Sequence, residues 1–255
     1  MPRADGDAFD RRSLHERIAA DLRDEIMSGD LAPGASLPST PRLTERFGAS
    51  NATVQKALRI LKDERLIVGR AGAAVTVREH HQEIVRPADF GQPAGPGEPY
   101  RWITEAGKRG KQAGIRLLEV SEARPPQDVA SALDLPDDGT AMMRRQVLSH
   151  DGDPVELVTS YYPLDLARGT ALSVARRIQG GTPALLAEMG HPPLRTVDRV
   201  SARVPTQQQY EALRLPSDLP ILRTLRVVYS SGDRPVEVTV MAKAGHLYEL
   251  HYEYS

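Results

Sequence analysis

The chain has 255 residues, a formal net charge of −1, 40% hydrophobic residues and no cysteine. The lack of cysteine excludes disulfides and thiolate metal sites. No apolar run approaches the roughly 20 residues that cross a bilayer, and the N-terminal residues Met1 to Arg12 are polar, unlike a signal peptide. Length and apolar content predict two domains in a cytoplasmic protein without a membrane segment.

The first predicted helix begins with a capping box. Ser13 precedes Glu16 at the spacing at which the serine hydroxyl and the glutamate carboxylate exchange backbone hydrogen bonds. Apolar residues then recur every fourth position, at Leu14, Ile18, Leu22 and Ile26. Gly29 can end the helix in a left-handed conformation. We expect this helix to be the scaffold of an N-terminal domain.

Two shorter helices and a hairpin are predicted next. Ser39 can cap a helix that ends near Phe47, Gly48 allows a sharp turn, and Ser50 can cap a helix that extends to about Asp63. Val54, Ala57, Leu58 and Leu61 fall on one side of that last helix. Leu66-Ile67-Val68 and Val75-Thr76-Val77, joined by Gly69-Arg70-Ala71-Gly72, predict a two-stranded wing. This order is that of a winged helix-turn-helix.

The polar face of the Ser50 helix indicates DNA binding. The segment from Ser39 to Arg78 holds eight Lys/Arg and three Asp/Glu, a net charge of +5 in a chain whose total is −1. A domain whose charged face is merely solvated is the alternative, but it does not require this local excess of cations. The candidate DNA-binding residues are Ser39, Thr40, Arg42, Ser50, Asn51, Thr53, Gln55, Lys56, Arg59, Lys62, Arg70 and Gly72.

This segment resembles the GntR family of bacterial transcription regulators. The resemblance covers about Leu14 to Arg78 and is carried by Leu37-Pro38-Ser39, Leu43, Phe47-Gly48, Ser50, Thr53-Val54, Ala57-Leu58, Leu61 and Leu66-Ile67. It implies that the Ser50 helix enters double-stranded operator DNA. Positions at which the family commonly has arginine hold Pro41, Asn51 and Gln55. Because Asn and Gln match adenine, we expect half-sites that depend more on A·T pairs than the family's GT…AC core.

The composition changes after Arg78. Between Pro87 and Pro99, seven of thirteen residues are Pro or Gly, a density that disfavours regular structure. We therefore expect a DNA-binding domain at residues 1–78, a linker at residues 79–99 and a second domain at residues 100–255.

The second domain contains an internal repeat. Pro126–Tyr162 and Pro205–Lys243 each read as a short helix ending in Ala-Leu, then Leu-Pro, a strand, a Gly-Asp turn and a return strand that opens with Pro-Val-Glu. A strand is also predicted from Ile115 to Arg124, and the connection between the copies predicts a helix with Thr182 as its cap and Pro183 in its first position. The repeat predicts an α+β domain with an antiparallel sheet and pseudo-twofold symmetry.

This half resembles the UTRA ligand-sensing domain, which follows GntR heads in the HutC subfamily and has a chorismate-lyase-like fold. The resemblance covers about Tyr100 to Ser255 and is carried by Leu133, Gly139, Asp151-Gly152, Pro154, Thr159-Ser160-Tyr161, Gly190, Leu213, Leu215-Pro216 and Gly232 to Glu237. It implies a homodimer and an effector pocket between the two repeats. Family members that sense sugar phosphates have arginines where this chain has Gln146 and Leu148, so a phosphosugar effector is not expected.

Strand alternation selects the residues that face this pocket. Glu156, Val158, Ser160 and Tyr162 share one face of the first return strand, and Glu237, Thr239, Met241 and Lys243 share one face of the second. The alternative is that this face of the sheet is exposed to solvent. The candidate effector-binding residues are Arg144, Gln146, Glu156, Ser160, Tyr162, Glu237, Thr239 and Lys243.

Together the two halves predict a ligand-responsive regulator, a repressor that binds a palindromic operator as a homodimer and responds to a small-molecule effector. Two alternatives remain open from the sequence. One is an architectural or plasmid-maintenance DNA-binding protein whose second domain only dimerises, and the other is a lyase-like enzyme. The sequence has no glycine-rich phosphate loop, nucleophile elbow or metal-spaced His/Asp cluster, so no enzyme activity, metal or cofactor is expected.

Overall fold

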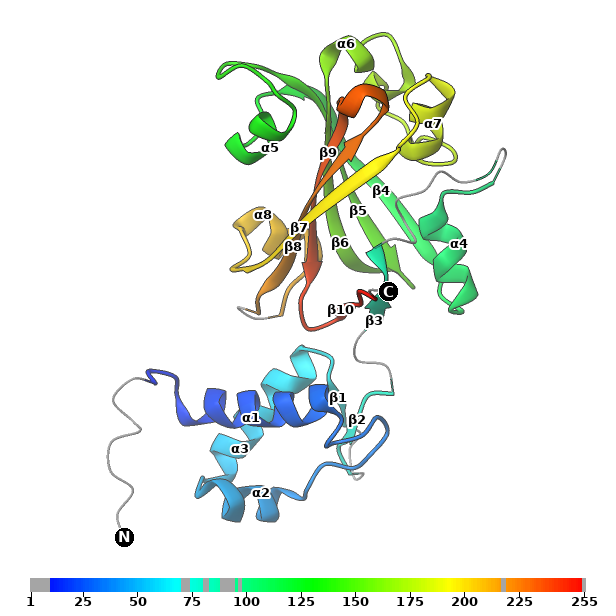
Figure 1. Cartoon of the computed structure of the whole chain (residues 1–255). Coiled ribbons are helices and arrows are strands. Elements are labelled where there is room, and N and C mark those ends of the chain that lie inside the picture. Colours follow the sequence, from blue (N-terminus) through cyan, green and yellow to red (C-terminus); the bar gives the residue numbers. More distant parts are fainter. Residues whose placement is uncertain are drawn as a thin grey trace. The chain divides into compact units, whose positions relative to one another are not determined.

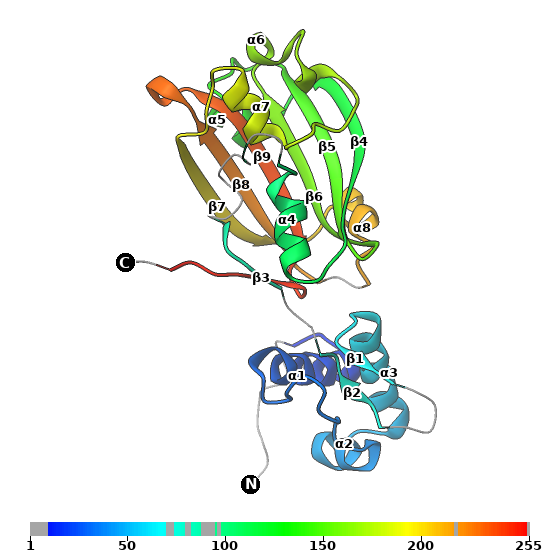
Figure 2. The same cartoon turned by 90° about the vertical axis from the view of Figure 1, so that its right-hand side faces the viewer.

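A computed structural model describes residues 10–69, 74–79, 83–87, 95, 98–216 and 219–253 (Figure 1, Figure 2). The chain separates into two compact units, Met1–Glu83 and Ile84–Ser255. Both units combine helices with antiparallel strands, which confirms the predicted mixture of helix and sheet.

The first unit has three helices and a small sheet. Helices α1 (Leu14–Ser28), α2 (Thr40–Phe47) and α3 (Asn51–Asp63) precede strands β1 (Ile67–Val68) and β2 (Thr76–Val77), which pair antiparallel. An isolated bridge joins Ser36 to Thr76, so the segment before α2 also contacts this sheet. The order and pairing of these elements confirm the predicted winged helix-turn-helix.

The apolar stripes of the three helices meet in one core. Leu22 and Ile26 of α1, Leu43 of α2, and Val54 and Leu61 of α3 are all fully buried there. Burying one such side chain stabilises a fold by about 1.5–3 kcal/mol. This core therefore fixes α3 through one side and leaves its other side exposed.

Local signals at the helix ends set where the helices begin and stop. Ser50 Oγ accepts a hydrogen bond of 3.2 Å from the N–H of Thr53, and Gly48 ends α2 with a φ of 58°. Ser39 stands directly before α2 as predicted, but its hydroxyl makes no capping hydrogen bond. Ser39 is the N-cap residue, but Pro41 at the second helical position has no N–H, so one of the two usual donors to a capping hydroxyl is missing.

The second unit is built on a six-stranded antiparallel sheet. Its strands, in spatial order, are β4 (Ala113–Ala123), β5 (Ala141–His150), β6 (Asp153–Tyr162), β9 (Pro235–Ala244), β8 (Ile221–Tyr229) and β7 (Arg195–Arg203). The order is symmetric about the central β6–β9 pair, as expected from the repeat. The predicted antiparallel sheet is confirmed.

Each repeat includes a strand that precedes the pattern shared by the two copies, and the first of these strands, β4, was predicted at Ile115 to Arg124. Strand β4 precedes helix α5 (Gln127–Ala132) and β7 precedes helix α8 (Gln207–Leu213), so both copies run strand, helix, strand, strand. β7 has no counterpart among the predicted elements. Most of its residues are exposed on both faces, so no apolar alternation marks it.

Helices cover both faces of the sheet. On one face α5 and α8 pack over apolar side chains of β6, including Leu157 and Tyr161. The other face is covered by α4 (Arg101–Lys108), α6 (Leu164–Ala167), α7 (Thr182–Glu188) and the paired strands β3 (Glu83–Val85) and β10 (Tyr248–Leu250). Figure 2 shows α4 and α7 in front of the sheet. Two short turns of 3-10 helix, Ala171–Ser173 and Ser231–Asp233, complete the fold.

Two local predictions differ from the structure. Helix α7 begins one residue earlier than predicted, so that Gly181 and not Thr182 is its cap, and Pro183 is its second residue. A Cβ on Gly181 would lie 2.3 Å from Tyr100 Cδ2, and its φ is 83°, so both space and backbone require glycine. Strand β3 lies inside the predicted linker, and its Val85 is buried.

Candidate functional site

Helix α3 presents the polar face that was singled out for DNA contact. Its exposed side chains on this face are Asn51, Gln55, Lys56, Arg59 and Lys62. Gln55 and the three cations line a groove between α3 and the β1–β2 pair, which Thr40, Gly69 and Val75 also border. A groove with cations along one wall fits the phosphate backbone of a nucleic acid.

Several hydroxyl and amide candidates are engaged within the domain. Gln55 Nε2 donates to Thr40 Oγ1 at 3.2 Å and thereby joins α3 to α2. Ser50 Oγ and Thr53 Oγ1 lie 2.9 Å apart in a hydrogen bond at the start of α3. These groups position the helix. Ser39 and Arg42 are exposed on α2 and its cap, whereas Arg70 and Gly72 lie outside the described residues.

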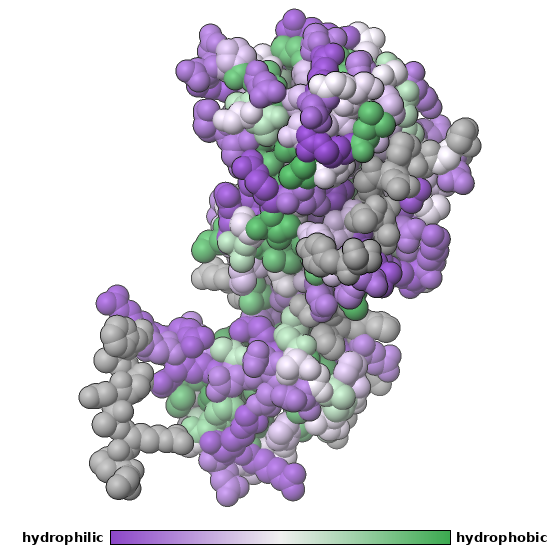
Figure 3. Space-filling model, viewed as in Figure 1, coloured by the Kyte–Doolittle hydropathy of each residue, from purple (hydrophilic) through white to green (hydrophobic). Residues whose placement is uncertain are grey.

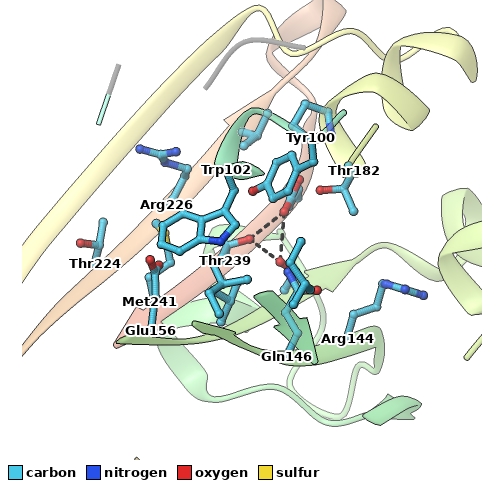
Figure 4. A pocket seen from close by; sticks show the side chains of 18 of the residues that line it. Tyr100, Trp102, Arg144, Gln146, Glu156, Thr182, Thr224, Arg226, Thr239 and Met241 are labelled. Atoms are coloured by element: carbon cyan, nitrogen blue, oxygen red, sulfur yellow. Dashed lines mark hydrogen bonds between the residues drawn. The ribbon is translucent and has the colours of Figure 1, made fainter. Parts of the chain in front are cut away.

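The second unit contains a cavity of about 120 Å³ on the face of the sheet covered by α4 and α7 (Figure 4). All eight candidate effector-binding residues line it: Arg144, Gln146, Glu156, Ser160, Tyr162, Glu237, Thr239 and Lys243. The six that belong to β6 and β9 are buried. The alternative that this face is exposed to solvent is therefore wrong.

Glu237 is the centre of a buried hydrogen-bond network in this cavity. Its Oε1 accepts hydroxyl hydrogen bonds from Ser160 (3.1 Å), Tyr162 (3.1 Å) and Thr239 (2.7 Å). Ser160 Oγ also lies 2.7 Å from Thr239 Oγ1. Each hydroxyl has one proton to donate, so two protons serve three contacts: two with Glu237 Oε1 and one between the hydroxyls. The side chain is only 7% exposed. Burial and the negative charge of Glu237 raise the pKa of Tyr162 well above its ordinary value, so its hydroxyl remains a donor.

Two ion pairs lie elsewhere along the cavity wall. Lys243 Nζ donates to Glu156 Oε1 at 2.7 Å, and both side chains are buried. Arg226 holds both carboxylate oxygens of Asp198, at 2.8 and 2.7 Å, and also donates to the carbonyl of Pro87 at 3.2 Å. The bidentate pair joins β8 to the edge strand β7 and brings Asp198 to the cavity.

Arg144 is buried at the wall with its guanidinium directed at the backbone. Nη1 donates to the carbonyls of Leu172 (2.8 Å) and Val174 (2.9 Å), and Nη2 donates to that of Arg176 (2.7 Å). Burial lowers the pKa of Arg144 from its ordinary value. The geometry gives Arg144 a positioning role, because it holds residues 171–176 against strand β5.

Two aromatic side chains at the start of α4 border the same cavity. Figure 4 shows the rings of Tyr100 and Trp102 next to each other. Trp102 also stacks on His150, with ring centroids 4.5 Å apart. Burial, followed by the negative charges of Glu237 and Glu156, raises the pKa of Tyr100 well above its ordinary value, so its phenol stays protonated.

Sequence reasoning missed Tyr100, Trp102, Asp198 and Arg226 as cavity residues. Asp198 belongs to β7, which the sequence pattern does not reveal. Arg226 is accessible to the alternation argument, because Thr224, Arg226 and Val228 share one face of β8 and all line the cavity. Applying the alternation argument to the strand before each hairpin turn, β5 and β8, as well as to the return strand after it, β6 and β9, identifies this face of the sheet.

The visible surface of both units is mostly hydrophilic, with apolar residues in small groups (Figure 3). Among the helices that the structure describes, none combines the length and the apolar character needed to span a membrane.

Comparison with known proteins identifies both units. A family model described as "Bacterial regulatory proteins, gntR family" matches residues 14–77, and the UTRA domain model matches residues 108–249. The HTH-type transcriptional regulator SCO4628 of Streptomyces coelicolor is 24% identical over 252 residues, 95% of this chain and 91% of that protein. The regulator GgaR of Escherichia coli K12 is 24% identical over 247 residues, 94% of this chain and 91% of GgaR.

Solved structures show the same fold. The crystal structure of a GntR-family transcriptional regulator aligns with a TM-score of 0.61 and 24% identity, covering 96% of this chain and 98% of that one. PhnF from Mycobacterium smegmatis aligns with a TM-score of 0.55 and 22% identity, covering 93% of this chain and all of PhnF. The chain belongs to the GntR family of transcription regulators and has the architecture of the HutC subfamily, a winged helix-turn-helix domain followed by a UTRA domain.

Proposed function

We propose that this chain is a cytoplasmic repressor that binds a palindromic operator as a homodimer and changes its operator affinity when a small-molecule effector enters the UTRA cavity. The observation that carries the proposal is the cavity with its buried polar network, in a chain whose other unit is a GntR head. An effector that binds one arrangement of the heads better than another couples the two sites through that difference in binding free energy.

The cavity also helps to distinguish a ligand-binding domain from a domain that only dimerises. A domain that only dimerises gains nothing from a hollow lined with buried charges, because burying polar groups costs stability unless they are fully paired. This argues for a ligand-binding role over an architectural one. The family and the relatives are transcription regulators, which are not enzymes.

The homodimer is supported by the symmetry of the proposed target. A palindrome presents the same half-site twice, and a two-fold pair of identical heads matches it. The net charge of −1 gives no long-range repulsion between copies.

The DNA-binding face can be tested with two variants of α3. Asn51→Ala should flatten the sequence preference, because an asparagine that reads adenine contributes about 1–3 kcal/mol of discrimination. Lys62→Ala should weaken binding to all sequences alike and lower the slope of affinity against salt by about one. Fluorescence anisotropy over a salt series, with operators selected from random DNA, measures both effects and the number of chains bound per operator.

The same measurements have outcomes that contradict the proposed DNA-binding face of α3 or the homodimer. Selection of guanine-dominated half-sites that are indifferent to Asn51 and Gln55 shows that another face of α3 enters the groove. One chain per operator contradicts the homodimer.

The effector response should depend on Tyr162. Tyr162→Phe removes one of the hydroxyl donors to Glu237 Oε1, and a hydrogen bond of this kind to a charged group is worth about 1.5–3 kcal/mol. The effector concentration for half-maximal response should therefore rise about tenfold or more, while operator affinity without effector stays within about threefold because Tyr162 belongs to the other unit. The response is measured as operator release by the low-molecular-mass fraction of a bacterial extract.

The neighbouring Tyr161 provides a matched control. It is also buried, at 6% exposure, but lies on the opposite face of β6, under α5, so Tyr161→Phe should leave the effector response unchanged. An equal loss of operator binding without effector in the Tyr162→Phe protein assigns this hydroxyl to folding instead.

A further inference from the structure

The carboxylate of Glu237 is used through only one of its oxygens. All three hydroxyl hydrogen bonds end at Oε1. Within the described part of the chain, Oε2 accepts none, and it is not among the polar atoms that are both sealed from solvent and unpartnered. Glu237 lines the cavity, so the unsealed Oε2 is available to a group that binds there.

Among the described residues, four cations line the cavity. Three of them are engaged elsewhere, and the fourth, Arg177, is exposed. Lys243 is paired with Glu156, Arg226 with Asp198, and Arg144 with backbone carbonyls. Among the described acids that line the cavity, Glu237 alone has hydroxyl partners and no basic one. A carboxylate held at 7% exposure without a cation is a strong site for a positively charged donor.

The remaining lining suits the apolar part of such a ligand. Tyr100, Trp102 and Tyr162 border the same cavity, and aromatic faces attract cations as well as apolar groups. Since a water-sized group needs about 10–15 Å³ of this kind of volume, the cavity of about 120 Å³ accommodates on the order of ten non-hydrogen atoms.

We propose that the effector is a small organic cation, a primary amine or related nitrogen base, whose N–H groups bind Glu237 Oε2 while its apolar part lies against Tyr100 and Trp102. The inference rests on the proposed function, because it names the ligand class of the same cavity. A carboxylate or phosphate placed at this point meets the like charge of Glu237 and is repelled.

Three probes of nearly equal size separate charge from shape: phenethylamine, 2-phenylethanol and phenylacetate. Isothermal titration calorimetry and thermal shift on the full chain should show binding of the amine, about tenfold weaker binding of the alcohol, and no binding of the acid, since a charge-assisted hydrogen bond is roughly twice as strong as a neutral one. Binding of phenylacetate as tightly as the amine, or no binding of the amine at millimolar concentration, overturns the proposal.

The variant Glu237→Gln tests the residue itself. It keeps the shape and an acceptor for the hydroxyls but removes the charge, so amine affinity should fall about tenfold or more while 2-phenylethanol binds as before. Glu122→Gln, an exposed carboxylate on β4 that pairs with Arg168, is the matched control and should change neither affinity. Unchanged amine affinity in Glu237→Gln contradicts the assignment, and the three-probe comparison on the unaltered chain decides the matter even where the variant does not fold.

Repeating the titrations with operator DNA distinguishes this inference from the proposed function. Amine binding that leaves operator affinity unchanged supports the cation site and contradicts ligand-responsive regulation by it. Operator release that follows only the anionic fraction of a cell extract contradicts the cation site and supports regulation.

Discussion

Replacing Lys243 by methionine is expected to lower the free energy of unfolding of the second unit by about 3–5 kcal/mol. Lys243 and Glu156 face each other across β9 and β6, with Nζ and Oε1 2.7 Å apart, and they are 6% and 3% exposed. Removing the ammonium leaves a carboxylate in a low-dielectric cavity without its cation. Urea unfolding followed by circular dichroism near pH 7, together with calorimetry, measures the loss.

The double variant Glu156→Leu with Lys243→Met shows whether that loss comes from the unpaired charge. Replacing a whole buried pair by apolar residues is often neutral or stabilising by about 1–4 kcal/mol, so the double variant should recover most of the stability. The exposed pair Arg168–Glu122 is the control, with two hydrogen bonds of 2.7 and 2.6 Å. Arg168→Met should leave the free energy of unfolding nearly unchanged, because solvent screens an exposed pair. Equal losses for Lys243→Met and Arg168→Met contradict the argument from burial.

Such a pair contributes little net stability compared with apolar residues, so its presence calls for another reason. In the cavity it keeps the charge of Lys243 away from Glu237, whose Oε2 remains available. The Lys243–Glu156 pair and the Glu237 network therefore belong to one arrangement, in which Glu237 is the acid of the described cavity lining that has no basic partner.

The head could be predicted from the sequence almost to the residue. Its helices begin and end at local signals, such as Ser50 and Gly48, and each has an apolar stripe of helical period that is buried in one core. Strands β6 and β9 could be predicted because their duplicated turns fix where each return strand begins. Strand β7 could not, since an edge strand with both faces largely exposed carries no alternation.

The candidate cavity was predictable in outline but not in its contacts. Alternation along β6 and β9 identifies which side chains share a face. It does not give the pairing of Ser160 with Thr239 across the strands, which brings two hydroxyls to one carboxylate oxygen. Nor does it show that Arg144 is held by carbonyls of residues 171–176, because a turn distant in sequence supplies them.

Arg23→Ala is expected to destabilise the DNA-binding head by about 3 kcal/mol or more. Arg23 of α1 donates through Nε and Nη2 to the two carboxylate oxygens of Glu64, at 2.8 and 2.7 Å, and Glu64 is 0% exposed at the end of α3. This bidentate pair joins the scaffold helix to the helix proposed to enter DNA. Its loss removes two charge-assisted hydrogen bonds from a buried carboxylate. Calorimetry on the full chain should show a lower transition temperature for the head.

A second arginine in the same domain shows whether the loss of stability depends on burial of the ion pair or on its charge alone. Arg46 of α2 pairs with Glu25 of α1, but its side chain is 45% exposed, so Arg46→Ala should cost less than about 1 kcal/mol. Arg23→Lys should fall between the two alanine variants, because lysine keeps the charge but cannot form the planar two-point contact. Well below the unfolding transition of the head, the Arg23→Ala protein should bind operator as tightly as the unaltered chain does. Its affinity should then fall steeply as the head unfolds. Loss of affinity at low temperature, with the head still folded, instead makes Arg23 part of the DNA-contacting surface, and the ion pair then orients α3 as well as stabilising it.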